Sequence, residues 1–385
     1  MIREKDRHAA LLDRVRQWVR DTAIPAESAV AEADHIDASL VQSMRDEGFF
    51  GWSIPEEYGG RGMTAEELVM GAMELSQCST AFRARVGTNT GIGSEALVVD
   101  GTADQKARYL PALAAGEITG CFALTEVEAG SEATNLQTTA MRDGDEWVLN
   151  GSKRFITNAP IADLFTVFAR TDPTSKGSKG ISAFLVDATV TGIKAGPAYR
   201  KMGQSGSPVS DVVIENCRLP AAALLGGQEG AGFQTTMKVL NKQRLHLAAL
   251  CIGPAIRMLE EAITYATGRS QFGKPVAQHQ LVQAMIADCQ TEIAAARALV
   301  LQTARKRDQG EDTKLDASMC KYFASEMCGR VADRAVQIFG GSGYVADFSS
   351  IERFYRDVRL FRLYEGTSQI HQLNIAKLTL AEHAA

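Results

Sequence analysis

One carboxylate near the end of the chain, Glu365, has neighbours suited to acid–base chemistry. It follows Leu363 and Tyr364, and a carboxylate held against such side chains is poorly solvated, which raises its pKa towards the range of a general base. Gly366 lets the backbone turn sharply, and Thr367 offers a hydroxyl suited to begin a helix. The alternative is an exposed glutamate at a helix end, which is the commoner situation for an arbitrary Glu-Gly pair.

A buried cation is the second candidate. Arg244 shares one helical face with Leu240 and Leu247, so its side chain is expected inside the protein. A buried arginine needs an anionic partner. This pattern fits a structural ion pair and an anion-binding role equally well.

Composition excludes several classes of protein. The chain has 385 residues, which favours two or three packed subdomains over one core. Its net charge is −5 and no large basic stripe is evident, so nucleic acid is not an expected partner. The cysteines number seven, an odd number, and no Cys-x-x-Cys occurs, so we expect reduced thiols and no metal site. No signal peptide or membrane-spanning run is evident, and we therefore expect a cytoplasmic protein.

The hydrophobic period changes twice along the chain. Residues 1–118 have helical period, residues 119–228 contain short strand-like runs, and residues 229–385 return to helical period. Asp143-Gly144 is a hairpin signal within the middle segment. We therefore predict an α+β protein with three domains at these limits, the middle one an antiparallel sheet or barrel.

Glycines interrupt the last helical segment of the first domain. Gly87, Gly91 and Gly93 follow Arg85 within a few residues. Each glycine in a helix costs roughly 1 kcal/mol relative to alanine. Either the helix is kinked, or another part of the protein approaches its backbone closely.

Seven motifs, in order along nearly the whole chain, resemble those of the acyl-CoA dehydrogenase family. The resemblance implies a helical domain, a β domain and a C-terminal four-helix bundle, and a homotetramer built as a dimer of dimers. It also implies bound FAD, oxidation of an acyl-CoA thioester to the trans-2-enoyl product, and an electron-transfer flavoprotein as acceptor. The motifs are Pro55–Gly60, Thr125–Ser131, Asn150–Asn158, Lys201–Gly203, Arg269–Gly273, Gln337–Tyr344 and Tyr364–Thr367.

The resemblance assigns the reacting groups. Glu365 matches the family's base, and its own N–H matches the donor to the enolate oxygen, together with a ribityl hydroxyl of the flavin. Some members place the base just before the residue that matches Arg244, but Gln243 stands there and cannot accept a proton. The implied substrate-binding residues are Ser131, Asn241, Arg244, Tyr364 and Gly366.

The implied FAD contacts form several groups. Three positions depart from the family's usual residues: Val127 replaces proline, Glu132 replaces aspartate, and Phe155 replaces tryptophan. The flavin contacts are Phe122, Leu124, Thr125, Gly130, Ser131, Phe155, Ile156 and Thr157. Arg269, Phe272 and Gln280 match contacts to the pyrophosphate and adenine across a subunit boundary, Gln337 and Gly341 match the partner-subunit wall, and Thr367 and Gln369 match further FAD contacts.

The acyl chain is less well specified. Several stretches resemble the very-long-chain branch, without its C-terminal membrane extension, and the small residues at 87, 91 and 93 would deepen an acyl pocket. We therefore expect a medium to long or branched chain, with Arg85 and Glu95 facing away from the pocket. The alternatives are a flavoenzyme of the same fold that acts on a carrier-protein thioester or as an oxidase or monooxygenase, and a non-catalytic assembly factor.

Overall fold

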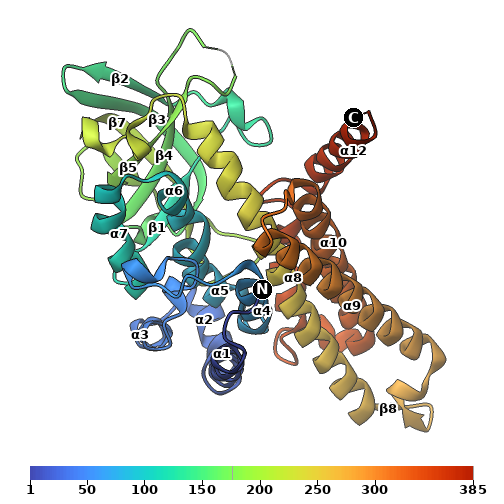
Figure 1. Ribbon diagram of the computed structural model, residues 1–385. Helices are drawn as coiled ribbons and strands as arrows, with labels where there is room; N and C mark the ends of the chain where they lie inside the picture. Colours follow the sequence, from blue (N-terminus) through green and yellow to red (C-terminus); the bar gives the residue numbers. More distant parts are fainter. Residues whose placement is uncertain (176, 385) are drawn as a thin grey trace.

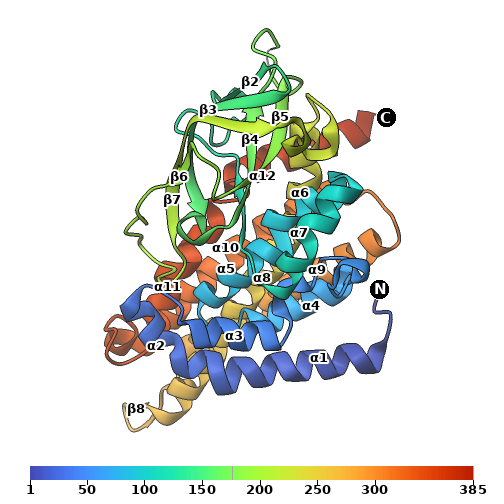
Figure 2. The same cartoon turned by 90° about the vertical axis from the view of Figure 1, so that its left-hand side faces the viewer.

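The computed structural model describes residues 1–175 and 177–384, which form two groups of helices and a β domain (Figure 1). The N-terminal helices lie below the β domain, and the C-terminal helices lie beside both (Figures 1 and 2). The predicted α+β layout of helices, strands and helices is confirmed. Within the described residues, no helix is long and apolar enough to cross a lipid bilayer.

The N-terminal helices pack around a cluster of aromatic side chains. Trp18 contacts Phe49 and Phe82 edge-on, with ring centroids 5.1 and 5.7 Å away. A π-turn, Val19–Ala23, joins the first two helices, and Pro25 therefore lies in the first turn of the second, where a missing N–H costs least. The helices are α1 (Lys5–Trp18), α2 (Ile24–Ala33), α3 (Ala38–Asp46), α4 (Ala65–Leu75), α5 (Thr80–Gly87), α6 (Gly93–Asp100) and α7 (Ala103–Ala115).

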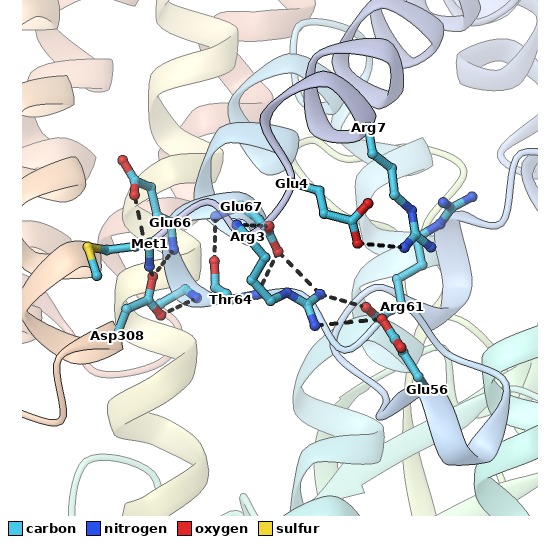
Figure 3. Close-up of polar contacts among 11 residues, drawn as sticks. Met1, Arg3, Glu4, Arg7, Glu56, Arg61, Thr64, Glu66, Glu67 and Asp308 are labelled. Atoms are coloured by element: carbon cyan, nitrogen blue, oxygen red, sulfur yellow. Dashed lines mark hydrogen bonds and ion pairs between the residues drawn. The ribbon is translucent and has the colours of Figure 1, made fainter.

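Hydrogen bonds to carboxylates join the start of α4 to the C-terminal domain (Figure 3). Asp308 accepts hydrogen bonds from the N–H groups of Ala65 and Glu66, at 2.7 and 3.1 Å. These groups lack partners within the helix, and negative charge near a helix N-terminus is stabilising. Thr64 and Glu67 add a capping box at the same place.

The glycine-rich segment combines both expected explanations. Helix α5 passes through a π-turn, Thr88–Ile92, into α6, and Gly91 leaves helical geometry at φ −149° and ψ −119°. A Cβ on Gly91 would lie 2.6 Å from the Gln243 side chain. A Cβ on Gly93 would lie 2.7 Å from the Gly120 carbonyl oxygen. The helix is therefore kinked, and two neighbours also approach it too closely for any side chain.

The β domain is one sheet with the order β1-β4-β2-β3-β7-β6, and β5 pairs with β4. The hairpin predicted at Asp143-Gly144 joins β2 to β3. The sheet is not purely antiparallel as expected, because β1 pairs with β4 in parallel and the whole β2–β3 hairpin serves as their crossover. The strands are β1 (Gly120–Ala123), β2 (Thr139–Asp143), β3 (Glu146–Thr157), β4 (Leu164–Arg170), β5 (Ile181–Asp187), β6 (Ile193–Ala195) and β7 (Val209–Pro220).

Long helices make up the C-terminal domain and share one apolar core. Helix α8 starts beside the β domain and ends at the small β8–β9 hairpin at the opposite tip (Figure 1). Its first residues pack against β5, so α8 links the two domains. The elements are α8 (Gly232–Gly268), β8 (Ser270–Gln271), β9 (Lys274–Pro275), α9 (Gln280–Asp308), α10 (Lys314–Phe339), α11 (Ile351–Val358) and α12 (Ser368–Ala384).

A buried ion pair organises the β domain. The Lys153 ammonium is inaccessible to solvent and donates to Glu126 Oε1 at 2.6 Å and to the carbonyls of Leu124 and Phe168 at 3.3 and 2.5 Å. Glu126 also accepts from the Thr138 N–H at 3.0 Å, which closes the loop between β1 and β2. Burial lowers the pKa of Lys153 to about 8, although the negative charge of Glu126 opposes this shift.

Removing this ammonium should be costly. We expect Lys153→Met to lower the free energy of unfolding by about 3–5 kcal/mol, because it leaves the Glu126 carboxylate buried without its cation. Denaturant unfolding of the variant and the parent protein measures the difference. The control is Arg218→Met, which removes exposed pairs with Asp143 and Glu146 and should cost at most about 1 kcal/mol. Equal losses in the two variants would contradict this reading of the pair.

Candidate active site

A cavity of about 500 Å³ lies where α5, the β domain, α8 and the segment before α12 meet. It contains most of the residues that the sequence assigned to a flavin and a substrate. The predicted residues that line it are Phe122, Leu124, Thr125, Gly130, Ser131, Phe155, Ile156, Thr157, Arg244, Tyr364, Glu365 and Gly366.

Glu365 occupies an unusual backbone conformation. Its φ is 54°, and that of Gly366 is 97°. A non-glycine residue in this region costs roughly 1–3 kcal/mol, which surrounding contacts must offset. Two buried side chains provide them: His371 Nε2 lies 3.2 Å from the Glu365 carbonyl oxygen, and Lys321 Nζ donates to the Gly366 carbonyl oxygen at 2.6 Å. Helices α10 and α12 therefore fix the direction in which Glu365 points.

The Glu365 carboxylate is poorly solvated, as the sequence predicts. Within the described residues, its Oε2 atom is inaccessible to solvent and has no hydrogen-bond partner. Burial raises the pKa of Glu365, while the positive charges of Arg83, Lys321 and Arg244 oppose that rise. The Glu365 N–H also donates no hydrogen bond to a described residue. Glu365 thus offers both a carboxylate that could act as a base and a backbone N–H that is free to donate a hydrogen bond.

Arg244 has no structural ion pair. Its Nη1 donates to Asn241 Oδ1 at 3.2 Å, and no acidic group of the described residues lies within salt-bridge distance. Burial lowers the pKa of Arg244, and the charge of Glu365 partly offsets this. The sequence analysis offered a structural ion pair or an anion-binding role for Arg244, and the structural ion pair is wrong. Asn241 lies behind Arg244 and does not itself line the cavity.

Three functional candidates escaped the sequence analysis. Arg83 and His246 line the cavity, and Lys321 lies behind the turn at Gly366. Burial lowers the pKa of His246 to about 3, with the charge of Arg83 adding to the effect, so its imidazole is neutral. The available signal for Arg83 was its spacing, one helical turn before Gly87, which borders the same cavity.

The cavity has the chemistry to hold a planar, polar-edged ring. Thr125, Ser131 and Thr157 bring hydroxyl groups, and Phe122 brings an apolar surface. Phe155 has φ 58° and is 63% exposed. An aromatic ring that is held out of its strand by a strained backbone is a surface for stacking. These features fit the isoalloxazine ring of FAD.

The remaining predicted cofactor residues lie elsewhere. Thr367 accepts from the Ile370 N–H at 3.2 Å and begins α12, and Gln369 is exposed beside it. The other group lies at the tip where α8 and α10 end, where Tyr265 and Phe339 stack with centroids 4.3 Å apart. Its members do not line the cavity and are exposed, Phe272 to 94%: Arg269, Phe272, Gln280, Gln337 and Gly341.

Two charged residues face away from the cavity, as expected. The Arg85 guanidinium lies over the Phe50 ring at 5.3 Å, and Glu95 accepts from Lys242 at 2.6 Å. Of the three glycines expected to deepen the pocket, Gly87 alone lines it. Gly91 and Gly93 instead make room for protein neighbours.

Three domain families match the chain in order: acyl-CoA dehydrogenase, N-terminal domain, at residues 5–117; middle domain, at 121–217; and C-terminal domain, at 230–380. The chain belongs to the acyl-CoA dehydrogenase family. It is therefore an oxidoreductase of the type that acts on CH–CH bonds with a flavin.

Similar proteins cover almost the whole chain. A 3-(aryl)acrylate reductase of Clostridium sporogenes is 40% identical, over 96% of this chain and 98% of its own. An acyl-CoA dehydrogenase of Bacillus subtilis is 39% identical, over 95% and 96%. The structure of butyryl-CoA dehydrogenase from Megasphaera elsdenii has a TM-score of 0.94 at 32% identity, covering 99% of this chain and all of its own. These names span several substrates and both reaction directions, and the resemblance to the very-long-chain branch is not confirmed.

Two further relatives concern the cofactor and the electron carrier. The FAD complex of PigA has a TM-score of 0.93 at 27% identity, over 98% of this chain and 99% of its own, so family members bind FAD. The CarC subunit of the caffeyl-CoA reductase–Etf complex of Acetobacterium woodii is 39% identical, over 91% of this chain and 92% of its own.

The raised pKa of Glu365 should be visible in the pH dependence of its reaction. A base acts only when ionised, so the rate should fall as the pH drops through this pKa. Because burial raises the pKa, the fall should begin above the ordinary glutamate value of 4.5. Anaerobic stopped-flow mixing with an acyl-CoA across the pH range measures it. A rate that stays constant down to pH 4.5 while the protein remains folded would contradict the assignment.

Proposed function

We propose that the protein is an FAD-dependent acyl-CoA dehydrogenase that converts an acyl-CoA thioester to the trans-2-enoyl product. The observation that carries the proposal is the Glu365 carboxylate, unpaired at Oε2, in a cavity that the family's flavin residues also line. Family membership supports the chemistry, and the site geometry supports the residues.

Glu365 removes the α-proton of the thioester. That proton is only weakly acidic, so the step needs a positioned base and a donor for the oxygen on which negative charge develops. The free N–H of Glu365 supplies this donor from the same residue. Its strained backbone is held by Lys321 and His371, so neither group must reorganise during the reaction.

The predicted cofactor residues that line the cavity would hold FAD against the substrate. When bound, FAD supplies the acceptor for the hydride that leaves the β-carbon. Phe155 and Phe122 would contact the ring, and the hydroxyls of Thr125, Ser131 and Thr157 would bond its polar edge. The exposed group around Arg269 and Gln337, at the tip where α8 and α10 end, does not line this cavity, which fits a cofactor bound between copies of the chain. The homotetramer is proposed from the family resemblance.

The reductase direction is the second candidate, because one close relative is named as an arylacrylate reductase. The same groups serve both directions: a protonated Glu365 can return a proton to the α-carbon of an enoyl thioester. The potential of the electron carrier decides which direction prevails. We propose an electron-transfer flavoprotein as this carrier, on the strength of the CarC relative. The cytoplasmic location stays a proposal from the sequence.

The site also bears on the alternative functions and on the expected length of the acyl chain. The free base argues against a monooxygenase, which needs no α-proton acceptor, and against a non-catalytic assembly factor. An oxidase and an enzyme of carrier-protein thioesters would use the same groups, and oxygen consumption and carrier loading distinguish them. The expectation of a medium to long or branched acyl chain gains no support from the cavity, because Gly91 and Gly93 do not open into it and Arg83 does.

The decisive variant is Glu365→Gln, which keeps the shape of the side chain and removes the base. We expect flavin bleaching by acyl-CoA to slow by about 10²–10⁴-fold, the usual contribution of a general base, with FAD still bound. Stopped-flow absorbance measures the rate, and protein-bound flavin is quantified separately. Glu117→Gln, at an exposed glutamate outside the cavity, is the matched control and should keep its rate. Retention of most of the rate by Glu365→Gln would refute the base assignment.

A further inference from the structure

We infer that a second cavity, on the C-terminal helices, binds a nucleoside phosphate. Its volume is about 440 Å³, against about 500 Å³ for the active-site cavity, and the two share no lining residue among those that the structure describes. It lies between α10 and the segment made of α11 and the 3₁₀ turn Arg359–Arg362. The inference goes beyond the proposed function, because it gives the protein a second ligand.

Four arginine side chains line this arginine cavity in two pairs. Arg330 and Arg334 are one helical turn apart on α10, and Arg359 and Arg362 are three residues apart in the turn that follows α11. Residues at these spacings lie on one side of a helix. Helices α10 and α11 pack against each other (Figure 2), so the cavity collects N–H donors from two walls.

The wall after α11 has arginine donors without acceptors. Arg359 forms no ion pair and no side-chain hydrogen bond with a described residue, and its Nη1 atom is inaccessible to solvent. Arg362 Nη1 lies 3.4 Å from Glu326 Oε2, but its Nε atom is inaccessible and unpaired. A partly buried guanidinium without an acceptor is costly. A ligand with anionic oxygens would supply the acceptors that this wall lacks.

The wall on α10 is already compensated by carboxylates. Glu292 on α9 pairs with Arg330 at 2.6 Å and with Arg334 at 2.9 Å, and Asp288 lies 3.4 Å from Arg334. Asp333 also borders the cavity, but it is exposed and forms no ion pair with a described arginine. The anionic group of the ligand is therefore expected at the other wall, next to the unpaired guanidinium.

Size and lining favour a nucleoside phosphate over a simple anion. Guanidinium groups match phosphate oxygens with two parallel N–H bonds, and one phosphate can bind two arginines. A phosphate group alone would leave most of the 440 Å³ empty, whereas this volume is ordinary for a small organic ligand. Tyr355 borders the cavity and is 42% exposed, so its ring offers a surface on which a base can stack.

The phosphate would compete with a carboxylate of the protein. Glu326 pairs with Arg362, and its Oε1 atom also accepts from Ser368 Oγ at 2.5 Å. A phosphate at Arg362 draws on the N–H groups that Glu326 now occupies. Replacement of this glutamate by glutamine removes the competing charge and keeps an oxygen for Ser368, so it should strengthen nucleotide binding.

The test titrates the FAD-loaded protein with ADP, inorganic phosphate and adenosine, and measures binding by calorimetry. We expect ADP to bind in addition to FAD, and phosphate and adenosine to bind more weakly, because each makes only part of the contacts. Arg359→Gln should weaken ADP binding by about 10- to 100-fold, the loss of a charged hydrogen bond. Glu326→Gln should tighten it. Arg20→Gln, at an exposed arginine of the N-terminal helices, is the matched control and should bind as the parent does.

Several results would overturn the inference. No ADP binding, or binding that is unchanged in Arg359→Gln or releases FAD, would exclude this cavity as the nucleotide site. Phosphate that binds as tightly as ADP would show a site for the anion alone. A lower molecular mass of Arg359→Gln in light scattering, without ADP binding by the parent, would make the cavity a contact between copies of the chain. None of these results depends on turnover, so the inference and the proposed function can fail separately.

Discussion

The site depends on holding one carboxylate at a backbone geometry that it does not favour. Glu365 adopts a left-handed φ of 54°, and the energy for this comes from outside its own segment. Lys321 on α10 donates a hydrogen bond to the Gly366 carbonyl oxygen, and His371 Nε2 on α12 lies within hydrogen-bond distance of the Glu365 carbonyl oxygen. Lys321 thereby contributes twice, because its hydrogen bond fixes the turn and its charge limits the rise in the pKa of Glu365. The same fold that strains the backbone also supplies the electrostatics that the strained residue needs.

The cavity lies where the N-terminal helices, the β domain and the C-terminal helices meet. Helix α5 brings Arg83 from the N-terminal part, β1 and β3 bring Phe122 and Phe155, and α8 brings Arg244. Buried hydrogen bonds fix the relative positions of these elements. Asp357 beside the base segment accepts from Thr80 at the start of α5 and from the Gln204 N–H in the β domain. Hydrogen bonds are directional, so they restrict the relative positions of two elements more than apolar contacts alone do.

The sequence could predict the helix–β–helix order from its changes of hydrophobic period, and the poorly solvated setting of Glu365 from its neighbours in the chain. The flavin residues of the β domain were inferred from the family resemblance and stay a prediction. Leu363, Tyr364 and Gly366 predict the environment of Glu365 from four consecutive residues. Arg83 was missed because its spacing from Gly87 was the one available signal, and nothing near it in the chain shows that no described acidic side chain pairs with its guanidinium. The parallel pairing of β1 with β4 was missed for a related reason: strand period determines which face is buried, not which strand lies alongside.

The glycines show how one observation can have two causes. All three were expected to widen an acyl pocket, yet Gly91 and Gly93 serve close approach by Gln243 and Gly120. Gly87 alone borders the cavity, and a Cβ there would make only ordinary van der Waals contact, 3.7 Å from Arg83 Nε. Small residues in a helix therefore predict that another group lies close to it, but the sequence does not show whether that group is a ligand or part of the protein. Arg83 lines the cavity beside Gly87, so this wall of the cavity is polar and not the apolar surface that a longer acyl chain would need.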